Sequence, residues 1–142
     1  MTEQAQRIAL ITGGSRGLGH NMATSLIDRG VDVIVTYRER AESAQAVVAY
    51  ARERGRGAAA LQLDVGDVAS FGAFADRLRG ALLELGDGKL DFLVNNAGHG
   101  VHAPFVETTP EQLRGLVDVH FVGPFLLTQR VVGLMRDGGR IL

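Results

Sequence analysis

A glycine-rich turn between an apolar run and a helical pattern is the feature that most constrains the fold of this chain. The run, residues 8–11 (Ile-Ala-Leu-Ile), is continuously apolar, which is typical of a strand in a sheet covered on both faces. The turn occupies residues 12–19 and contains four glycines. The helix that follows is expected to end near Gly30 and to bury a stripe formed by Leu18, Met22, Leu26 and Ile27.

Glycines in such a turn serve separate purposes. One permits a tight reversal, another lets the main chain approach a pyrophosphate, and a third lets the helix pack closely on the strand. The free N–H groups at the start of the helix then face a phosphate, aided by the helix dipole. The pattern therefore favours nucleotide binding, although many proteins join strands to helices through glycine-rich turns that bind nothing.

Three further apolar runs alternate with helical patterns along the chain. Such alternation is typical of an α/β fold with a parallel, doubly wound sheet and right-handed crossovers. A capping Asp67 is expected to begin the third helix, and phenylalanines at helical spacing are expected in the core rather than in a binding site. The predicted elements are strands at 31–37, 58–63 and 89–95, and helices at 41–54 and over the stretch that carries Phe71, Phe74, Leu78 and Leu82.

Composition excludes several classes of function. The chain has 142 residues with a formal net charge of −1 and no basic tract, which argues against nucleic acid as a partner. It has no cysteine, so disulfides and thiolate chemistry are excluded and a reducing, cytoplasmic location is expected. The first residues, Met1 to Gln6, are polar and unlike a signal peptide, and no run approaches the ~20 apolar residues of a membrane span.

Three motifs together resemble those of the short-chain dehydrogenase/reductase family. They are Thr12-Gly13-x-x-x-Gly17-x-Gly19, Asp64-Val65 after the third strand, and Asn95-Asn96-Ala97-Gly98 after the fourth. The resemblance implies a Rossmann-like, three-layer α/β/α fold with strand order 3-2-1-4-5. It also implies that the second motif holds an adenine and the third a ribose. The implied cofactor-binding residues are Thr12, Gly13, Ser15, Arg16, Gly17, Leu18, Gly19, Tyr37, Arg38, Asp64, Val65, Asn96, Ala97 and Gly98.

The end of the second strand bears on the choice of cofactor. NAD-preferring members of the family usually carry an acidic residue where this chain has Tyr37, and Arg38 follows at once. Arg16 in the glycine turn is a second cation that could reach the same corner. Because arginine binds phosphate through a bidentate fork, the pair favours NADP(H) over NAD(H). Alternatively, Arg38 and Arg40 are solvated residues that open the next helix.

The segment after the fourth strand carries two histidines and then a long helix. His99 and His102 are expected to face substrate rather than a metal, since no third ligand is nearby. Thr109 is expected to cap the helix, which should bend at Pro124 and continue through Met135. The family places this helix in a subunit interface, which implies a homo-oligomer, but an ordinary sheet-covering helix would show the same periodicity.

His120 departs from the family pattern, which usually has asparagine at this position. That asparagine helps a main-chain carbonyl to hold a water in the proton path to the catalytic lysine. A histidine donates and accepts hydrogen bonds and titrates near neutrality, so it could take over this relay. It could equally be a packed histidine with no catalytic role.

The last six residues, 137–142, are predicted to form a turn and the beginning of a fifth strand. The catalytic serine and the Tyr-x-x-x-Lys pair of the family do not occur, since Tyr50 is followed four residues later by Arg54 and Tyr37 precedes no lysine at that spacing. We therefore expect residues 1–142 to be the N-terminal, NADP(H)-binding part of a single-domain oxidoreductase. Such an enzyme would act on a carbonyl or alcohol, with its catalytic residues beyond Leu142. The alternatives are a non-catalytic dinucleotide-binding module and an inactive truncated fragment.

Overall fold

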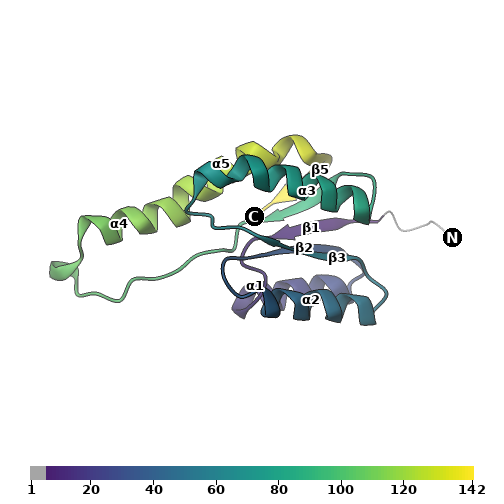
Figure 1. Ribbon diagram of the computed structural model, residues 1–142, viewed down its shortest axis with the longest axis horizontal. Helices are drawn as coiled ribbons and strands as arrows, with labels where there is room; N and C mark the ends of the chain where they lie inside the picture. The colour runs from purple at the N-terminus through teal and green to yellow at the C-terminus, as the bar shows by residue number, and fades with distance from the viewer. Residues whose placement is uncertain (1–5) are drawn as a thin grey trace.

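The computed structural model describes residues 6–142 and has three layers (Figure 1). A parallel sheet of five strands in the order β3-β2-β1-β4-β5 forms the middle layer. Helices α1 and α2 cover one face, and α3 and α5 cover the other. The bounds are β1 (Ile8–Ile11), α1 (Gly17–Asp28), β2 (Asp32–Tyr37), α2 (Ala41–Glu53), β3 (Ala58–Gln62), α3 (Phe71–Leu85), β4 (Leu90–Val94), α4 (Pro110–Val117), α5 (Gly123–Val131) and β5 (Met135–Ile141). The predicted fold class and strand order are confirmed.

The central strands divide their side chains between two apolar cores. In β1, Leu10 packs with α3 and α5, whereas Ile11 packs with α1 and α2. In β2, Ile34 joins the first core and Val33 joins the second. Because successive residues of a strand point to opposite faces, a strand covered on both sides must be apolar throughout. This is the physical reason for the continuous apolar runs in the sequence.

The buried stripe of α1 differs from the predicted one. Leu18 is 77% exposed, and the residues that face the sheet are Gly19, Ala23 and Ile27. A Cβ on Gly19 would lie 2.3 Å from the carbonyl oxygen of Gly13, so the first turn of the helix approaches the glycine turn too closely for a side chain. Small residues therefore occupy this face, and Leu18 points away from it.

Helix α3 carries the predicted core residues but not the predicted cap. Phe71, Phe74, Leu78 and Leu82 are all buried. The side chain of Asp67 makes no capping hydrogen bond, and a 3₁₀ turn (η1, Val68–Ser70) precedes the helix. The main-chain carbonyl of Asp67, rather than its carboxylate, accepts hydrogen bonds from the N–H and hydroxyl of Ser70.

The capping box predicted at Thr109 is confirmed, and α4 leads from it towards α5. The Thr109 hydroxyl accepts from the Gln112 N–H, and the Gln112 side chain accepts from the Thr109 N–H. Between the two helices lies a π-helical turn (η3, Asp118–Val122), so the irregularity begins before Pro124. Proline is tolerated there because it stands in the first turn of α5, where its missing N–H is not required.

The chain after α5 turns earlier than predicted. Helix α5 ends at Val131, a 3₁₀ turn (η4, Val132–Leu134) follows, and Met135 already belongs to β5. The residues predicted as a turn, around Gly138, lie inside β5, whose register with β4 shifts at an irregularity. Gly138 has a φ of +81°. The parallel ladder with β4 accommodates this glycine as a bulge-like distortion.

The polar residues Met1 to Ala5, on which the expectation of no signal peptide rests, lie outside the described residues. Within residues 6–142, none of the helices is both long enough and apolar enough to cross a membrane.

Candidate cofactor-binding site

A cavity of about 380 Å³ lies at the carboxyl ends of the strands. It opens where the strand order reverses between β1 and β4, the place at which doubly wound sheets bind ligands. Of the residues predicted to bind a cofactor, those that line it are Gly13, Ser15, Arg16, Gly17, Tyr37, Arg38, Asp64, Val65, Asn96, Ala97 and Gly98. Thr12, Leu18 and Gly19 do not line it.

Thr12 and Asn96 join the glycine turn to the loop after β4. The buried Thr12 hydroxyl accepts hydrogen bonds of 3.0 Å from the N–H groups of both Asn96 and Ala97. The Asn96 side-chain amide donates in return to the carbonyl oxygens of Thr12, at 3.1 Å, and Gly13, at 3.2 Å. Two segments more than 80 residues apart thus form one rigid unit, which we call the Thr12–Asn96 junction.

Two glycines of the turn are required for different reasons. Gly13 has a φ of +64°, and a Cβ there would lie 2.9 Å from the Cα of Ala97 across the junction. Gly17 has a φ of +57° with nothing within 4 Å of where its Cβ would be, so it is selected by its dihedrals. It begins α1, whose N-cap residue Arg16 makes no side-chain capping bond. The first N–H groups of α1 are therefore suited to bind an anion.

A cationic corner lies at the end of β2. Arg38 and Arg40 line the cavity there, and Arg16 of the glycine turn lines the same cavity, so both predicted phosphate-binding arginines border it. Glu39 stands among them, and its carboxylate lies 3.3 Å from the guanidinium of Arg38. The main-chain carbonyl of Arg38 accepts a 2.9 Å hydrogen bond from Gln62, which fixes this segment to β3.

Asp64 and Val65 form another wall of the cavity. The Asp64 carboxylate accepts a 2.8 Å hydrogen bond from the N–H of Gly66 and closes a turn. Val65 is buried, and a Cβ on Gly123 would lie 2.1 Å from its carbonyl oxygen. The beginning of α5 therefore packs directly behind this loop.

His120 does not line the cavity but packs behind the loop that does. Its Nε2 lies 2.7 Å from the carbonyl oxygen of His99, and a Cβ on Gly98 would lie 2.4 Å from its ring. Because a carbonyl only accepts, Nε2 is the nitrogen that carries a proton in this contact. The rings of His99 and His120 meet edge to face, with centroids 6.1 Å apart.

Several residues of the cavity were not predicted from the sequence. Thr36 is the clearest case, since its hydroxyl accepts a 3.0 Å hydrogen bond from the N–H of Gly13 and so positions the glycine turn. A polar residue inside an otherwise apolar, buried run was the available signal. His99, which was expected to face substrate, and Arg40, which was weighed as a solvated residue, also line it. For the remaining residues the sequence offered no signal of their position: Glu39, Leu63 and Val119.

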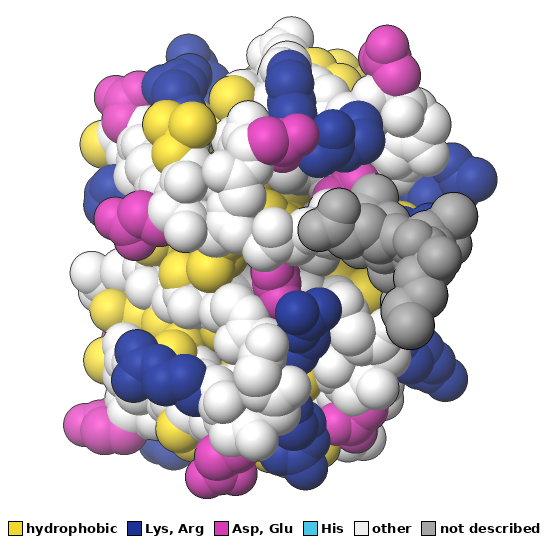
Figure 2. Space-filling view, turned by 90° about the vertical axis from the view of Figure 1, so that its right-hand side faces the viewer, with side chains coloured by type: hydrophobic (Ala, Val, Ile, Leu, Met, Phe, Trp, Pro, Cys, Tyr) yellow, Lys and Arg dark blue, Asp and Glu magenta, His cyan; other side chains and the backbone are white. Residues whose placement is uncertain are grey.

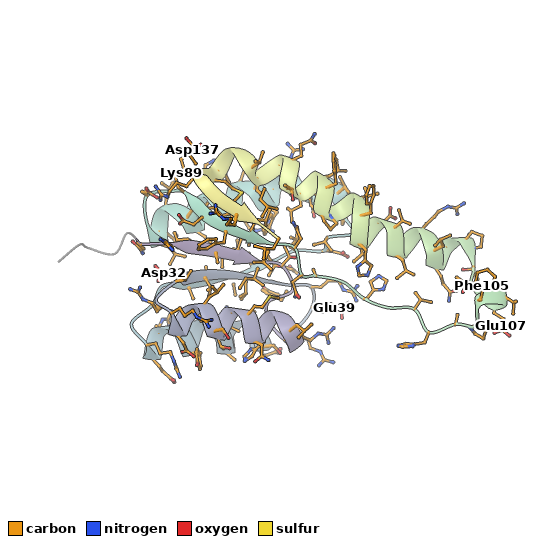
Figure 3. The ribbon with its side chains drawn as sticks, turned by 180° about the vertical axis from the view of Figure 1, so that it is seen from behind. Asp32, Glu39, Lys89, Phe105, Glu107 and Asp137 are labelled. Atoms are coloured by element: carbon orange, nitrogen blue, oxygen red, sulfur yellow. The ribbon has the colours of Figure 1, made fainter. Side chains whose placement is uncertain are left out.

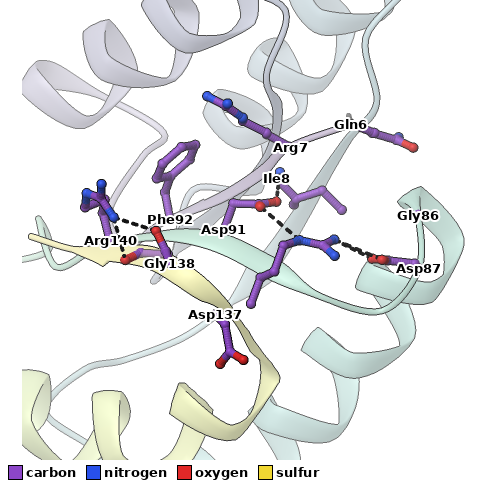
Figure 4. Close-up of a pocket in the computed structure, with 12 residues that line it drawn as sticks. Gln6, Arg7, Ile8, Gly86, Asp87, Asp91, Phe92, Asp137, Gly138 and Arg140 are labelled. Atoms are coloured by element: carbon purple, nitrogen blue, oxygen red, sulfur yellow. Dashed lines mark hydrogen bonds and ion pairs between the residues drawn. The ribbon is translucent and has the colours of Figure 1, made fainter. Parts of the chain in front are cut away.

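A second cavity, of about 590 Å³, lies at the opposite end of the sheet (Figure 4). Arg136 crosses it, donating to both carboxylate oxygens of Asp87 at 2.8 and 2.9 Å and to Asp91 at 3.1 Å. Asp91 also accepts from the N–H of Ile8. None of the predicted binding residues lies here, so we assign the ligand site to the smaller cavity.

Charges of both signs are distributed over the face of the molecule shown in Figure 2, and basic and acidic side chains lie interspersed there. Across residues 6–142, no three His, Cys, Asp or Glu side chains are grouped so that they could hold a metal ion. His99 and His102, the pair considered from the sequence, are among these residues.

Comparisons with known proteins agree with this geometry. A family model described as short chain dehydrogenase matches residues 7–142. Versicolorin reductase 1 of Aspergillus parasiticus is 34% identical over 137 residues, which are 96% of this chain and 50% of that protein. The 1-cyclohexenylcarbonyl-CoA reductase of Streptomyces collinus is 36% identical over 146 residues, 99% of this chain and 49% of that protein. The chain thus spans about half the length of these relatives.

Solved structures also match nearly all of this chain and about half of their own length. Landomycin C-6 ketoreductase LanV with bound NADP and rabelomycin matches with a TM-score of 0.90 and 34% identity, over 95% of this chain and 56% of that one. A short chain dehydrogenase from Burkholderia cenocepacia in complex with NADP matches with a TM-score of 0.85 and 37% identity, over 97% and 54%.

Proposed function

The chain belongs to the short-chain dehydrogenase family, and on this basis we propose that residues 1–142 form the NADP(H)-binding part of an oxidoreductase. The enzyme would transfer a hydride between the nicotinamide and a small carbonyl or alcohol substrate. The observation that carries this proposal is the Thr12–Asn96 junction, which joins the glycine turn to the loop after β4 at the edge of the sheet where the cavity opens. Solved relatives that hold NADP support the choice of cofactor for this chain.

The proposed roles follow from the position of each group. The first N–H groups of α1, beside Gly17, would bind the pyrophosphate. Arg16 and Arg38 would bind the 2′-phosphate, since both line the cavity and arginine binds phosphate through a bidentate fork. Asp64 and Val65 would hold the adenine, and the residues 96–98 would hold the ribose. Ser15 and Tyr37 would complete the walls around these groups, and Leu18, which does not line the cavity, would contribute only through its main chain in the first turn of α1.

We propose that this portion alone binds cofactor without turning substrate over. Hydride transfer to a carbonyl requires a proton donor held against the substrate oxygen. Neither Tyr37 nor Tyr50 is followed by a lysine four residues later, so the chain lacks the family's Tyr-x-x-x-Lys pair. His120 would take part in the proton path through Nδ1, because its Nε2 is engaged by the carbonyl of His99.

A homo-oligomer is part of the proposal. Leu113, Val117, Phe121 and Phe125 recur every four residues and are 46 to 70% exposed, so the segment from α4 to α5 presents an apolar stripe. Exposed stripes of this kind mark protein–protein contacts. Phe121→Arg combined with Phe125→Arg should shift the protein to monomers in sedimentation velocity, whereas an unchanged assembly would contradict this surface.

Titration with NADPH and NADH tests the cofactor assignment. Arg38→Asp should weaken NADPH binding far more than NADH binding, because it replaces a phosphate-binding guanidinium by a carboxylate that repels phosphate. Equal losses for both cofactors would remove the 2′-phosphate assignment. Binding without turnover in a protein of full natural length would favour the alternative, a non-catalytic dinucleotide-binding module.

A further inference from the structure

Thr36 is a polar residue inside the otherwise apolar end of β2 that borders the cavity. It is 1% exposed and is the next-to-last residue of the strand. Figure 3 shows Asp32, the first residue of this strand, at one end of the sheet, and Glu39, two residues beyond Tyr37, at the other. Thr36 lies near the end marked by Glu39, and it lines the cavity there.

The parallel ladder between β1 and β2 indicates what the N–H of Gly13 would otherwise bind. The N–H of Asp32 donates to the carbonyl of Arg7, and the bonds of a parallel ladder recur at every second residue of each strand. Continued in this way, the ladder would bring the N–H of Gly13 to the main-chain carbonyl of Thr36. That N–H donates instead to the Thr36 hydroxyl, at 3.0 Å. The side chain thus replaces the ladder at the point where the main chain turns away.

Gly13 is held from both of the neighbouring strands. Its φ is +64°, and its carbonyl accepts a 3.2 Å hydrogen bond from the side chain of Asn96, in the loop after β4. The Thr36 hydroxyl holds the N–H of the same residue from β2. Without an acceptor on residue 36, this N–H would be left unpaired or would return to the ladder carbonyl. In either case the turn would lose the conformation that it has in this structure.

We propose that Thr36 is a positioning residue for the diphosphate of the cofactor. By ending the ladder of β1 and β2 early, its hydroxyl holds the glycine turn so that the first N–H groups of α1 face a phosphate. This inference rests on the proposed function. A turn that is already ordered binds more tightly, because it loses less conformational freedom when the ligand arrives. Since Thr36 acts through Gly13, its loss should affect the diphosphate more than the adenosine 2′-phosphate end of the cofactor.

An isosteric substitution isolates the hydroxyl. Thr36→Val keeps the shape of the side chain and suits a buried strand, but it removes the acceptor of the Gly13 N–H. With the protein of full natural length, NADPH affinity is measured by fluorescence titration, and the affinity of 2′-AMP, which has no 5′-phosphate, by displacement of NADPH. Thr36→Val should weaken NADPH binding about tenfold and 2′-AMP binding less than about twofold, because only NADPH reaches the first turn of α1. Thr36→Ser keeps the hydroxyl and should bind NADPH within about threefold of the wild type.

Thr108→Val is the matched control. Thr108 is exposed, donates a 3.1 Å hydrogen bond to the carbonyl of Pro104, and does not line the cavity. Its substitution should leave both affinities unchanged.

The outcomes separate this inference from the proposed function. Unchanged NADPH affinity in Thr36→Val, an equal loss for NADPH and 2′-AMP, or no recovery in Thr36→Ser would overturn the inference while leaving the proposed function intact. A Thr36→Val protein that does not fold would assign the hydroxyl to stability and would overturn the inference as well. A wild-type protein that binds neither ligand would overturn the proposed function and this inference with it.

Discussion

The imidazole of His120 occupies the space that a side chain on Gly98 would fill, and its Nε2 lies 2.7 Å from the carbonyl oxygen of the next residue, His99. The same π-helical turn reaches the loop after β3, because Val119 lies beside Gly66, and Gly123, the residue directly after the turn, packs on Val65. One irregular turn therefore supports both cofactor-binding loops from behind. π-helical turns are often found at functional sites.

A double-mutant cycle tests the contact between Gly98 and His120. Gly98→Ala should weaken NADPH binding by about tenfold, because the new methyl group would overlap the imidazole and push the loop into the cavity. In a His120→Ala background, Gly98→Ala should weaken NADPH binding much less, since the imidazole that its methyl group would overlap is absent. His120→Asn, which keeps a hydrogen-bond donor, should restore most of the binding lost in His120→Ala. Additive losses in the cycle would contradict the steric contact.

The Thr12 hydroxyl can be tested by an isosteric substitution. Thr12→Val keeps the shape but leaves the N–H groups of Asn96 and Ala97 without an acceptor, which should cost roughly 1–3 kcal/mol in the free energy of unfolding. Thr12→Ser keeps the hydroxyl and should lose less than about 1 kcal/mol. Urea denaturation of the three proteins measures both differences. A larger loss in Thr12→Ser than in Thr12→Val would show that the methyl group, and not the hydroxyl, holds the junction.

Gly19 and Gly80 form a matched pair for alanine substitution. Gly19→Ala should lower stability by about 1–3 kcal/mol and abolish NADPH binding, because its Cβ would meet the Gly13 carbonyl and the Asn96 amide. Gly80 is exposed in the middle of α3 with nothing within 4 Å of a Cβ. Gly80→Ala should therefore raise stability by roughly 0.5–1 kcal/mol. Thermal unfolding and NADPH titration of both variants check the contrast.

The ion pair at the larger cavity predicts an effect of acid on stability. The two hydrogen bonds from Arg136 hold the pKa of Asp87 below its ordinary value of 3.8. A lowered pKa adds stability above the unfolded pKa, and this stability is lost as the pH falls through the folded value. The melting temperature of the wild type should exceed that of Asp87→Asn at pH 6, and the difference should vanish well below pH 3.8. In an Arg136→Gln background the difference should be small at both pH values.

Local sequence determined most of the elements and their order. The continuously apolar runs at 8–11 and 32–37 predict strands buried on both faces, because each of their two faces is apolar. The capping box of Thr109 and Gln112 predicts the start of a helix, because the two side chains accept hydrogen bonds from main-chain N–H groups there. The glycines at 13 and 17 specified the turn after β1 through their dihedrals. These features depend on near neighbours in the chain, and they were predicted correctly.

Only the tertiary structure decided the features that depend on distant contacts. Leu18 faces outward because Gly13 and Asn96 leave no room beside Gly19, which the helical period could not show. Met135 belongs to β5, where its backbone pairs with that of Leu90 in β4, a contact that the local pattern could not show. The position of Glu39 beside Arg38 in the cavity likewise depends on where β2 and β3 end together. The spacing of apolar residues predicts which face of a helix or strand is buried. The space available on that face depends on segments that are distant in the sequence.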